Sequence, residues 1–193
     1  MAAIAVIAKY REDMSWINEL RCPTMIYDKS KDIPNLGREA ETYMRYIIEN
    51  YHSLPDHVIF LQGNPFDHLS GGTIEFLNRS ISQRGSGVEF LGTTYMEPPD
   101  ACGLRTTASF KALFTSEPPA TFVFSPGAQY VVPKQNILCR PKSFYETIRR
   151  VLVDFDKGRL NGSLVCAWTL ERMWTYIFDP SISHRELDYS SLL

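Results

Sequence analysis

The sequence predicts a single α/β domain in which a mixed, mainly parallel central sheet is flanked by helices. Short apolar runs alternate along the chain with longer segments whose apolar residues recur at helical spacing, an order typical of parallel strands joined by crossover helices. The composition, 44% hydrophobic and 22% charged over 193 residues, is sufficient to bury a core of that size. No repeat or long linker divides the chain, so we expect one domain over residues 1–193.

The first half of the chain supplies the most regular elements. We expect strands at residues 2–8, 24–27 and 58–61, and helices at 12–20 and 35–51. The helix at 35–51 is the clearest, because Ala40, Tyr43 and Ile47 belong to an apolar stripe of helical period. Asn35 is its expected N-cap.

The second half is less regular. We expect a helix at 69–81, strands at 88–91, 121–124 and 129–132, and helices over 144–155 and 167–178. Two Pro-Pro pairs and several Ser and Thr residues predict a long loop from 95 to 119, with one short helix around Phe110. The polar residues 181–193 either wrap over the surface or fray as a loose tail.

Charge and cysteine content limit the class of protein. Lys and Arg number 20 against 22 Asp and Glu, so the overall charge does not indicate a basic face that binds nucleic acid. No apolar stretch approaches the roughly 20 residues that span a bilayer, and the N-terminus lacks the basic region of a signal peptide. The four cysteines form no C-x-x-C pair and are interpreted as reduced thiols. We therefore expect a soluble cytoplasmic protein without a membrane span.

Polar residues follow several of the expected strands, at 9–13, 28–29, 62–68 and 125–129. In open parallel sheets, ligands bind beyond the carboxyl ends of the strands. These four segments are therefore expected to share one crevice, which makes them the main source of candidate site residues.

The start of the helix at 35–51 is a candidate anion site. Its unpaired backbone N–H groups favour negative charge, Gly37 allows a ligand close to the backbone, and the guanidinium of Arg38 suits a phosphate or carboxylate. The alternative is a capped helix whose Arg38 pairs with a surface acid.

Asp67 and His68, after the strand at 58–61, are candidate ligands for a divalent metal ion. The alternative is a Gly-Asn-Pro turn in which Asp67 caps the next helix. The spacing of His52, His57 and His68 fits no zinc pattern, and we expect His52 and His57 to be exposed in a loop.

Glu171 falls on the apolar face of the last helix. A carboxylate there is either ion-paired, with Arg172 or a more distant arginine, or has a shifted pKa suited to catalysis; the ion pair is the favoured reading. The sequence contains no G-x-S-x-G, no G-x-G-x-x-G and no P-loop motif, which argues against a serine hydrolase and ordinary dinucleotide or P-loop nucleotide binding.

Taken together, these segments resemble a family of uncharacterised proteins catalogued as a domain of unknown function. Its most specific blocks are Asn-Leu-Gly-Arg-Glu at 35–39 and Phe-Leu-Gln-Gly at 60–63. That family is in turn similar to glycosyltransferases of the A-type fold, through the block at 35–38, the Ser-Pro-Gly segment within 124–132 and the acidic helix block at 170–174.

The resemblance implies transfer of a sugar from a nucleoside diphosphate donor to a hydroxyl of a glycan or protein-glycan acceptor. Arg38 and the backbone at 35–37 would stabilise the diphosphate, Asp28 would contact the nucleoside, and Asp67 with His68 would hold Mn²⁺ or Mg²⁺. Gln129 would position hydroxyl groups, and Glu171 would be the carboxylate near the reacting carbon. The remaining candidates for nucleotide or substrate binding are Tyr10, Arg11, Asn35, Gly37, Gln62 and Asn64.

One departure from that family pattern keeps other functions open. Where such transferases carry Asp-x-Asp, this chain has the neutral Gln62-Gly63-Asn64. Either Asp67 and His68 take over the metal, or binding needs no metal, or the site has lost catalysis. The alternatives are thus a non-catalytic nucleotide- or sugar-binding module on the same fold and a metal-dependent hydrolase.

Overall fold

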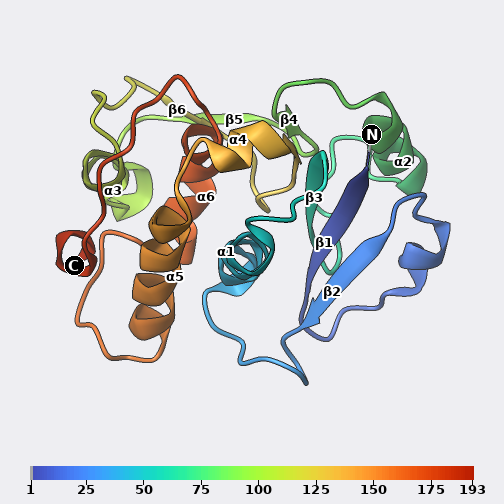
Figure 1. The fold of residues 1–193 in the computed structure, drawn as a ribbon, viewed down its shortest axis with the longest axis horizontal. Coiled ribbons are helices and arrows are strands. Elements are labelled where there is room, and N and C mark those ends of the chain that lie inside the picture. Colours follow the sequence, from blue (N-terminus) through green and yellow to red (C-terminus); the bar gives the residue numbers. More distant parts are fainter. Residues whose placement is uncertain (1) are drawn as a thin grey trace.

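A five-stranded sheet organises the chain; the structure, a computed structural model, describes residues 2–193, with Cys102 described by its backbone alone. Its strands, in spatial order, are β2 (Thr24–Asp28), β1 (Ala3–Lys9), β3 (His57–Gln62), β7 (Tyr130–Pro133) and β4 (Glu89–Phe90). β1 pairs in parallel with β2 and β3, whereas β7 runs antiparallel to both β3 and β4. Four strands therefore share one direction, which confirms the expected mixed, mostly parallel sheet. Figure 1 shows β1 between β2 and β3.

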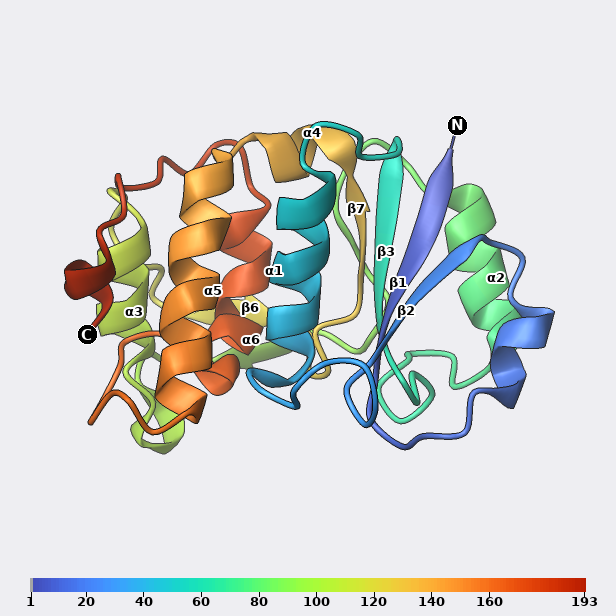
Figure 2. The same ribbon diagram turned by 60° about the horizontal axis from the view of Figure 1, so that its bottom comes forward.

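Helices cover both faces of this sheet (Figure 2). On one face lie α1 (Arg38–Asn50), α5 (Lys142–Asp156) and α6 (Ala167–Ile177), and on the other lie α2 (Ile74–Gln83) and the 3₁₀ helix η1 (Ser15–Glu19). Successive strand residues point to opposite faces, so Val58 and Phe60 pack in the first core while Ile59 and Leu61 pack in the second. The apolar run of β3 is thus explained by burial on both sides.

Two helices begin later than the sequence predicts. The helix expected at 12–20 is only the turn η1, because the Asp13 carboxylate accepts the Ser15 N–H at 3.0 Å and holds a non-helical turn. α1 begins at Arg38 and its N-cap is Gly37, so Asn35 is not the cap.

The helix expected at 69–81 also begins late, at Ile74. The Thr73 hydroxyl accepts the Phe76 N–H at 3.2 Å, which caps α2. Because Thr73 is the cap of α2, Asp67 does not cap the next helix.

The segment expected as a loop at 95–119 holds more structure than the sequence indicates. β5 (Tyr95–Glu97) pairs antiparallel with β6 (Phe122–Phe124) in a separate two-stranded sheet. Between them lie a 3₁₀ turn, η2 (Ala101–Gly103), and α3 (Thr106–Leu113), which confirms the helix around Phe110. One further helix, α4 (Lys134–Leu138), follows β7 directly and was not foreseen.

The last residues of the chain wrap over α3 and α5 rather than forming a loose tail. The Arg185 N–H donates to the Leu113 carbonyl at 2.9 Å, and the Tyr189 hydroxyl donates to Asp154 at 2.9 Å. Leu192, in the final 3₁₀ turn η3 (Tyr189–Leu192), is fully buried.

Two features bear on the expected class of protein. No helix within residues 2–193 is long and apolar enough to cross a membrane. Cys22, Cys139 and Cys166 are free thiols.

Candidate functional site

A cavity of about 520 Å³ opens at the carboxyl ends of β1 and β3, beside the start of α1. Six of the candidate residues line it, from three separate segments of the chain: Tyr10, Asn35, Arg38, Gln62, Asn64 and Asp67. The other lining residues are Ala8, Lys9, Glu12, Lys29 and Glu39. We call this the first cavity. It confirms that the segments after β1, β2 and β3 share one crevice, whereas the fourth expected segment, 125–129, does not line this cavity.

The start of α1 is held rigidly beside the first cavity. Gly37 has a left-handed φ of 61° and its N–H donates to the Asp156 carboxylate at 2.6 Å. The buried Lys29 ammonium donates to the carbonyls of Leu36 and Arg38, both at 2.5 Å. Because its N–H is already bonded and it does not line the cavity, Gly37 turns the chain and does not offer its backbone to an anion.

Arg38 is the most accessible cation of the first cavity. Its guanidinium carbon lies 4.5 Å from the ring centre of Trp168 at the start of α6, so the ring face orients the charge. Its backbone adopts a left-handed φ of 49°, a conformation that costs free energy in a side-chain-bearing residue and is often found at functional sites. No surface acid pairs with it among the ion pairs of residues 2–193.

Asp28 supports the first cavity from behind rather than lining it. Its carboxylate accepts hydrogen bonds from Lys9 at 2.5 Å and from the Ser30 hydroxyl and N–H. Hydrogen bonds from Lys9 and Ser30 hold the pKa of Asp28 well below its ordinary value. In this structure it orients Lys9, and contact with a nucleoside would need that pair to open. Arg11 also lies outside the lining, with its guanidinium over the Tyr10 ring.

The loop after β3 is fixed by a fully buried glutamine. The Gln129 side chain accepts the Gln62 N–H at 3.4 Å and donates to the Pro65 carbonyl at 2.9 Å. Both ends of its amide are therefore used inside the protein, which makes Gln129 a residue that positions the loop and not one that reaches a substrate hydroxyl. In the same loop the Asn64 amide donates to the Asp67 carboxylate at 2.9 Å.

A second cavity of about 310 Å³ adjoins the first at Asp67. Its lining includes His68, the exposed Tyr95 of β5, and Glu171 and Arg172 of α6. Glu171 accepts the Gly127 N–H at 2.9 Å and pairs with Arg172 at 3.1 Å, which confirms the expected ion pair. The expected metal ligands Asp67 and His68 thus border the same space as Glu171, which was expected near the reacting carbon.

A carboxyl group that sequence reasoning missed lies on the first cavity. Burial raises the pKa of Glu39, and the negative charge of Glu171 raises it further. The protonated form of Glu39 is therefore favoured relative to that of an exposed glutamate. Lys9, Glu12 and Lys29 also line the first cavity; they belong to the segments expected at the crevice, although none was singled out as a candidate residue.

The metal site remains a prediction. Among the side chains that the structure describes, no group of three or more His, Cys, Asp or Glu is arranged to hold a metal ion. Asp67 and His68 are both exposed and both border the second cavity. The Asp67 carboxylate is the type of ligand that Mg²⁺ and Mn²⁺ prefer, whereas the His68 imidazole is a poor ligand for Mg²⁺.

Comparison with known proteins gives one match. A family model described as a protein of unknown function (DUF3431) matches residues 5–75 and 92–190. No curated protein and no solved structure matches the chain.

Proposed function

The chain belongs to the DUF3431 family, and we propose that it is a glycosyltransferase of the A-type fold that moves a sugar from a nucleoside diphosphate donor to an acceptor hydroxyl on a glycan or protein-glycan. The observation that supports this best is the pair of adjoining cavities. The first offers Lys9 and Arg38 for an anionic donor, and the second, which begins at Asp67, offers room for an acceptor. Both volumes are in the range of small-molecule sites.

The chemistry requires a charged leaving group to be stabilised. The bond between the anomeric carbon and the diphosphate oxygen breaks, and the diphosphate departs with the bonding electrons. Arg38, oriented on Trp168, and Lys9 would face that negative charge in the first cavity. Mn²⁺ or Mg²⁺ held by Asp67 and His68 would, when bound, add further charge neutralisation at the diphosphate.

The acceptor must lose a proton as its oxygen bonds to the anomeric carbon. Glu171 is the candidate to accept that proton, because it borders the second cavity and its carboxylate is held by Gly127 and Arg172. An acceptor ring could also pack on the exposed Tyr95 at the same cavity. The products are then a glycoside, a nucleoside diphosphate and a protonated carboxyl that returns its proton to water.

The experiment is a binding titration with a panel of nucleoside diphosphates and their sugars, with and without Mn²⁺, on wild type and Arg38→Ala. Losing a charge-assisted hydrogen bond costs about 1.5–3 kcal/mol, so we expect affinity to fall roughly 10- to 100-fold. The matched control is Arg79→Ala, since Arg79 is also exposed and lies over an aromatic ring but outside both cavities.

The outcomes separate the candidate functions. If Arg38→Ala and wild type bind the nucleotides with equal affinity, Arg38 is not part of the donor site. If wild type binds none of the nucleotides, the proposal is overturned. Binding without sugar transfer to any glycan acceptor would instead favour the non-catalytic module, for which the neutral Gln62-Gly63-Asn64 loop is the supporting feature. Donor cleavage that no acceptor accelerates would favour a hydrolase.

A further inference from the structure

Two aromatic side chains are strongly exposed beside the second cavity. Tyr95 of β5 and Trp168 of α6 are each 52% exposed. Among the aromatic side chains that the structure describes, Tyr10 at the first cavity is the one other exposed ring. A large ring left in water keeps apolar surface exposed at a cost in free energy, so three such rings gathered at the two cavities indicate that a ligand covers them.

Trp168 stands on the same face of α6 as two residues of the second cavity. Trp168, Glu171 and Arg172 are three and four positions apart, which places them on one face of the helix. Glu171 and Arg172 line the second cavity. The Arg172 guanidinium also donates to the Trp168 carbonyl at 3.0 Å. Trp168 therefore lies one helical turn from the carboxylate proposed to accept the proton of the acceptor.

Each of the two rings is oriented by a neighbouring side chain. The guanidinium carbon of Arg38 lies 4.5 Å from the ring centre of Trp168. The ring centre of Tyr95 lies 6.3 Å from that of Phe124, with the two rings tilted by 36°. A ligand that packs on rings already held in place orders few side chains when it binds, which lowers the entropic cost of binding.

Charged side chains link the helix that carries one ring to the strand that carries the other. Arg172 of α6 donates to both carboxylate oxygens of Glu97 of β5, at 3.0 and 3.2 Å, and to Glu171 at 3.1 Å. Both carboxylates line the second cavity. A carboxylate has about four acceptor sites, so Glu97 and Glu171 have sites left to accept hydroxyl groups of a ligand.

Exposed rings with carboxylates between their elements match the chemistry of a chain of sugar units. A pyranose has a face of C–H groups that packs on an aromatic ring, and its hydroxyl edge donates to carboxylates. A protein partner would instead need a dry, apolar centre of contact, whereas the charged Glu97, Glu171 and Arg172 line this cavity. The phosphates of a nucleotide would meet two carboxylates beside a single arginine, which is unfavourable for an anion.

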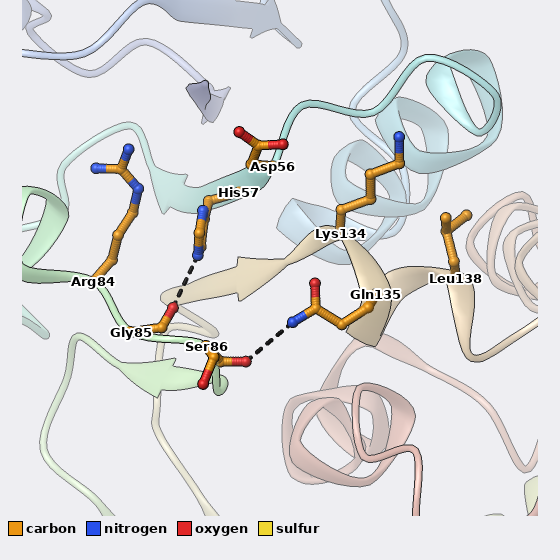
Figure 3. A pocket seen from close by; sticks show the side chains of 8 residues that line it. All are labelled: Asp56, His57, Arg84, Gly85, Ser86, Lys134, Gln135 and Leu138. Carbon is orange, nitrogen blue, oxygen red and sulfur yellow. Dashed lines mark hydrogen bonds between the residues drawn. The ribbon is translucent and has the colours of Figure 1, made fainter. Parts of the chain in front are cut away.

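The larger cavity at the start of β3, of about 600 Å³, offers no such surface (Figure 3). His57, which the sequence predicts in an exposed loop, is buried there because β3 pairs it with Ala3 and Pro133. Its Nε2 donates to the Gly85 carbonyl at 2.9 Å, since a carbonyl only accepts. The lining of this cavity contains no Phe, Tyr or Trp, and its exposed apolar side chain is Leu138. Leu138 is therefore a suitable control position.

We propose that Trp168 and Tyr95 form one binding surface for a neutral glycan of at least two sugar rings, which pack on the two side chains while their hydroxyls donate to Glu97 and Glu171. The inference deepens the proposed function, and it rests on that function for the role of the glycan as acceptor. It names the acceptor as a chain of sugars and not a single sugar or a small alcohol. Binding of the glycan needs neither nucleotide nor transfer.

The test is a titration of the full chain without nucleotide, followed by backbone amide chemical shifts. The probes are the homotetrasaccharides of glucose, galactose, mannose, xylose and N-acetylglucosamine, each beside its monosaccharide. For the tetrasaccharide that binds best we expect a Kd of about 0.1–1 mM, with shifts concentrated at residues 93–97 and 168–172. Its monosaccharide should bind at least about tenfold more weakly, because one ring covers only one of the two side chains.

Substitutions of the two rings test their role directly. Trp168→Ala and Tyr95→Ala should each weaken tetrasaccharide binding about tenfold, because each removes one apolar contact face. Trp168→Phe keeps a smaller ring and should weaken binding only about two- to threefold. Leu138→Ala is the matched control, since Leu138 is 39% exposed but borders neither the first nor the second cavity, and its Kd should equal that of wild type.

Each outcome decides for or against the proposal. Tetrasaccharide binding that is lost in Trp168→Ala and Tyr95→Ala and kept in Leu138→Ala supports it. The proposal is overturned if no tetrasaccharide shifts residues 93–97 and 168–172, if a monosaccharide binds equally well, or if the Kd is unchanged in Trp168→Ala. It is also overturned if Trp168→Ala weakens the binding of nucleoside diphosphates alone, because the ring then serves the donor.

Failure of this inference and failure of the proposed function give different results. Nucleotide binding without tetrasaccharide binding overturns the glycan surface and leaves the donor site. Tetrasaccharide binding without nucleotide binding overturns sugar transfer and leaves the glycan surface. The amide spectrum of each variant shows directly whether it is folded, so a misfolded variant is not mistaken for a loss of binding.

Discussion

Gly37 turns the chain at the start of α1, beside the first cavity. The substitution Gly37→Ala tests how much stability depends on a glycine at this position. The residue has a φ of +61°, and an added Cβ would lie 2.7 Å from both Glu41 Cβ and Leu152 Cδ2. A side-chain-bearing residue in the left-handed region costs about 1–2 kcal/mol, and forcing a methyl group into packed side chains adds about 1–3 kcal/mol. The free energy of unfolding should therefore fall by roughly 2–5 kcal/mol.

Urea unfolding measures that loss, and thermal unfolding should show a drop in Tm of roughly 2–4 °C for each kcal/mol in a chain of this size. Gly72→Ala is the matched control, because Gly72 has a φ of +60° but no atom within 4 Å of an added Cβ. It should lose only about 1–2 kcal/mol. If the two variants lose the same free energy, close packing at Gly37 is not a constraint and the reasoning is refuted.

Three further substitutions test the charges around the first cavity. Glu41→Gln should destabilise the fold by about 3–5 kcal/mol, because Glu41 is 1% exposed and neutralises the buried Lys29. If urea unfolding shows that the free energy of unfolding falls by less than about 1 kcal/mol, this reasoning is contradicted. The pKa of Asp28 is lowered in the folded state by Lys9, so its stabilisation is present at neutral pH and is lost as the pH falls below about 4. The Tm gap between wild type and Asp28→Asn should accordingly shrink at low pH, and a constant gap would refute the assignment. The pKa of Glu39 is raised by burial, so wild type loses stability as the pH rises above about 4. The Tm of Glu39→Gln should therefore rise relative to that of wild type between pH 4 and 7. If the Tm difference between the two proteins does not change over this range, the pKa of Glu39 is not raised.

Local pattern was enough to place most of the elements. The strands β1, β2, β3, β6 and β7 and the helices α1, α5 and α6 fall where apolar periodicity predicts them. Burial on one or both faces leaves a direct trace in the sequence, since the side chains that meet the core recur at the period of the element. Boundaries were less accurate, because caps such as the one at Thr73 are decided by single hydrogen bonds.

The sequence predicted which residues of the candidate site lie near one another, but not which of them face the cavity. Sequence reasoning brought Tyr10, Lys29 and Gln62 to one crevice, because polar residues follow parallel strands at the same edge of the sheet. It did not separate residues that face the cavity from those that support it. Asp28 and Gln129 are polar residues at the right strand ends, yet their side chains are used by Lys9 and by Pro65.

The sequence by itself determined the α/β class, the family and the order of most strands and helices, because these depend on periodicity and on local blocks of residues. Only the tertiary structure decided the reversed direction of β7, the burial of His57 between β1 and β7, and the placing of Asp67 and Glu171 on the same second cavity. The physical reason is that the partners lie far apart in the chain, 104 positions for that last pair. Their contact is fixed by the packing of a whole sheet and its helices, which no local pattern records.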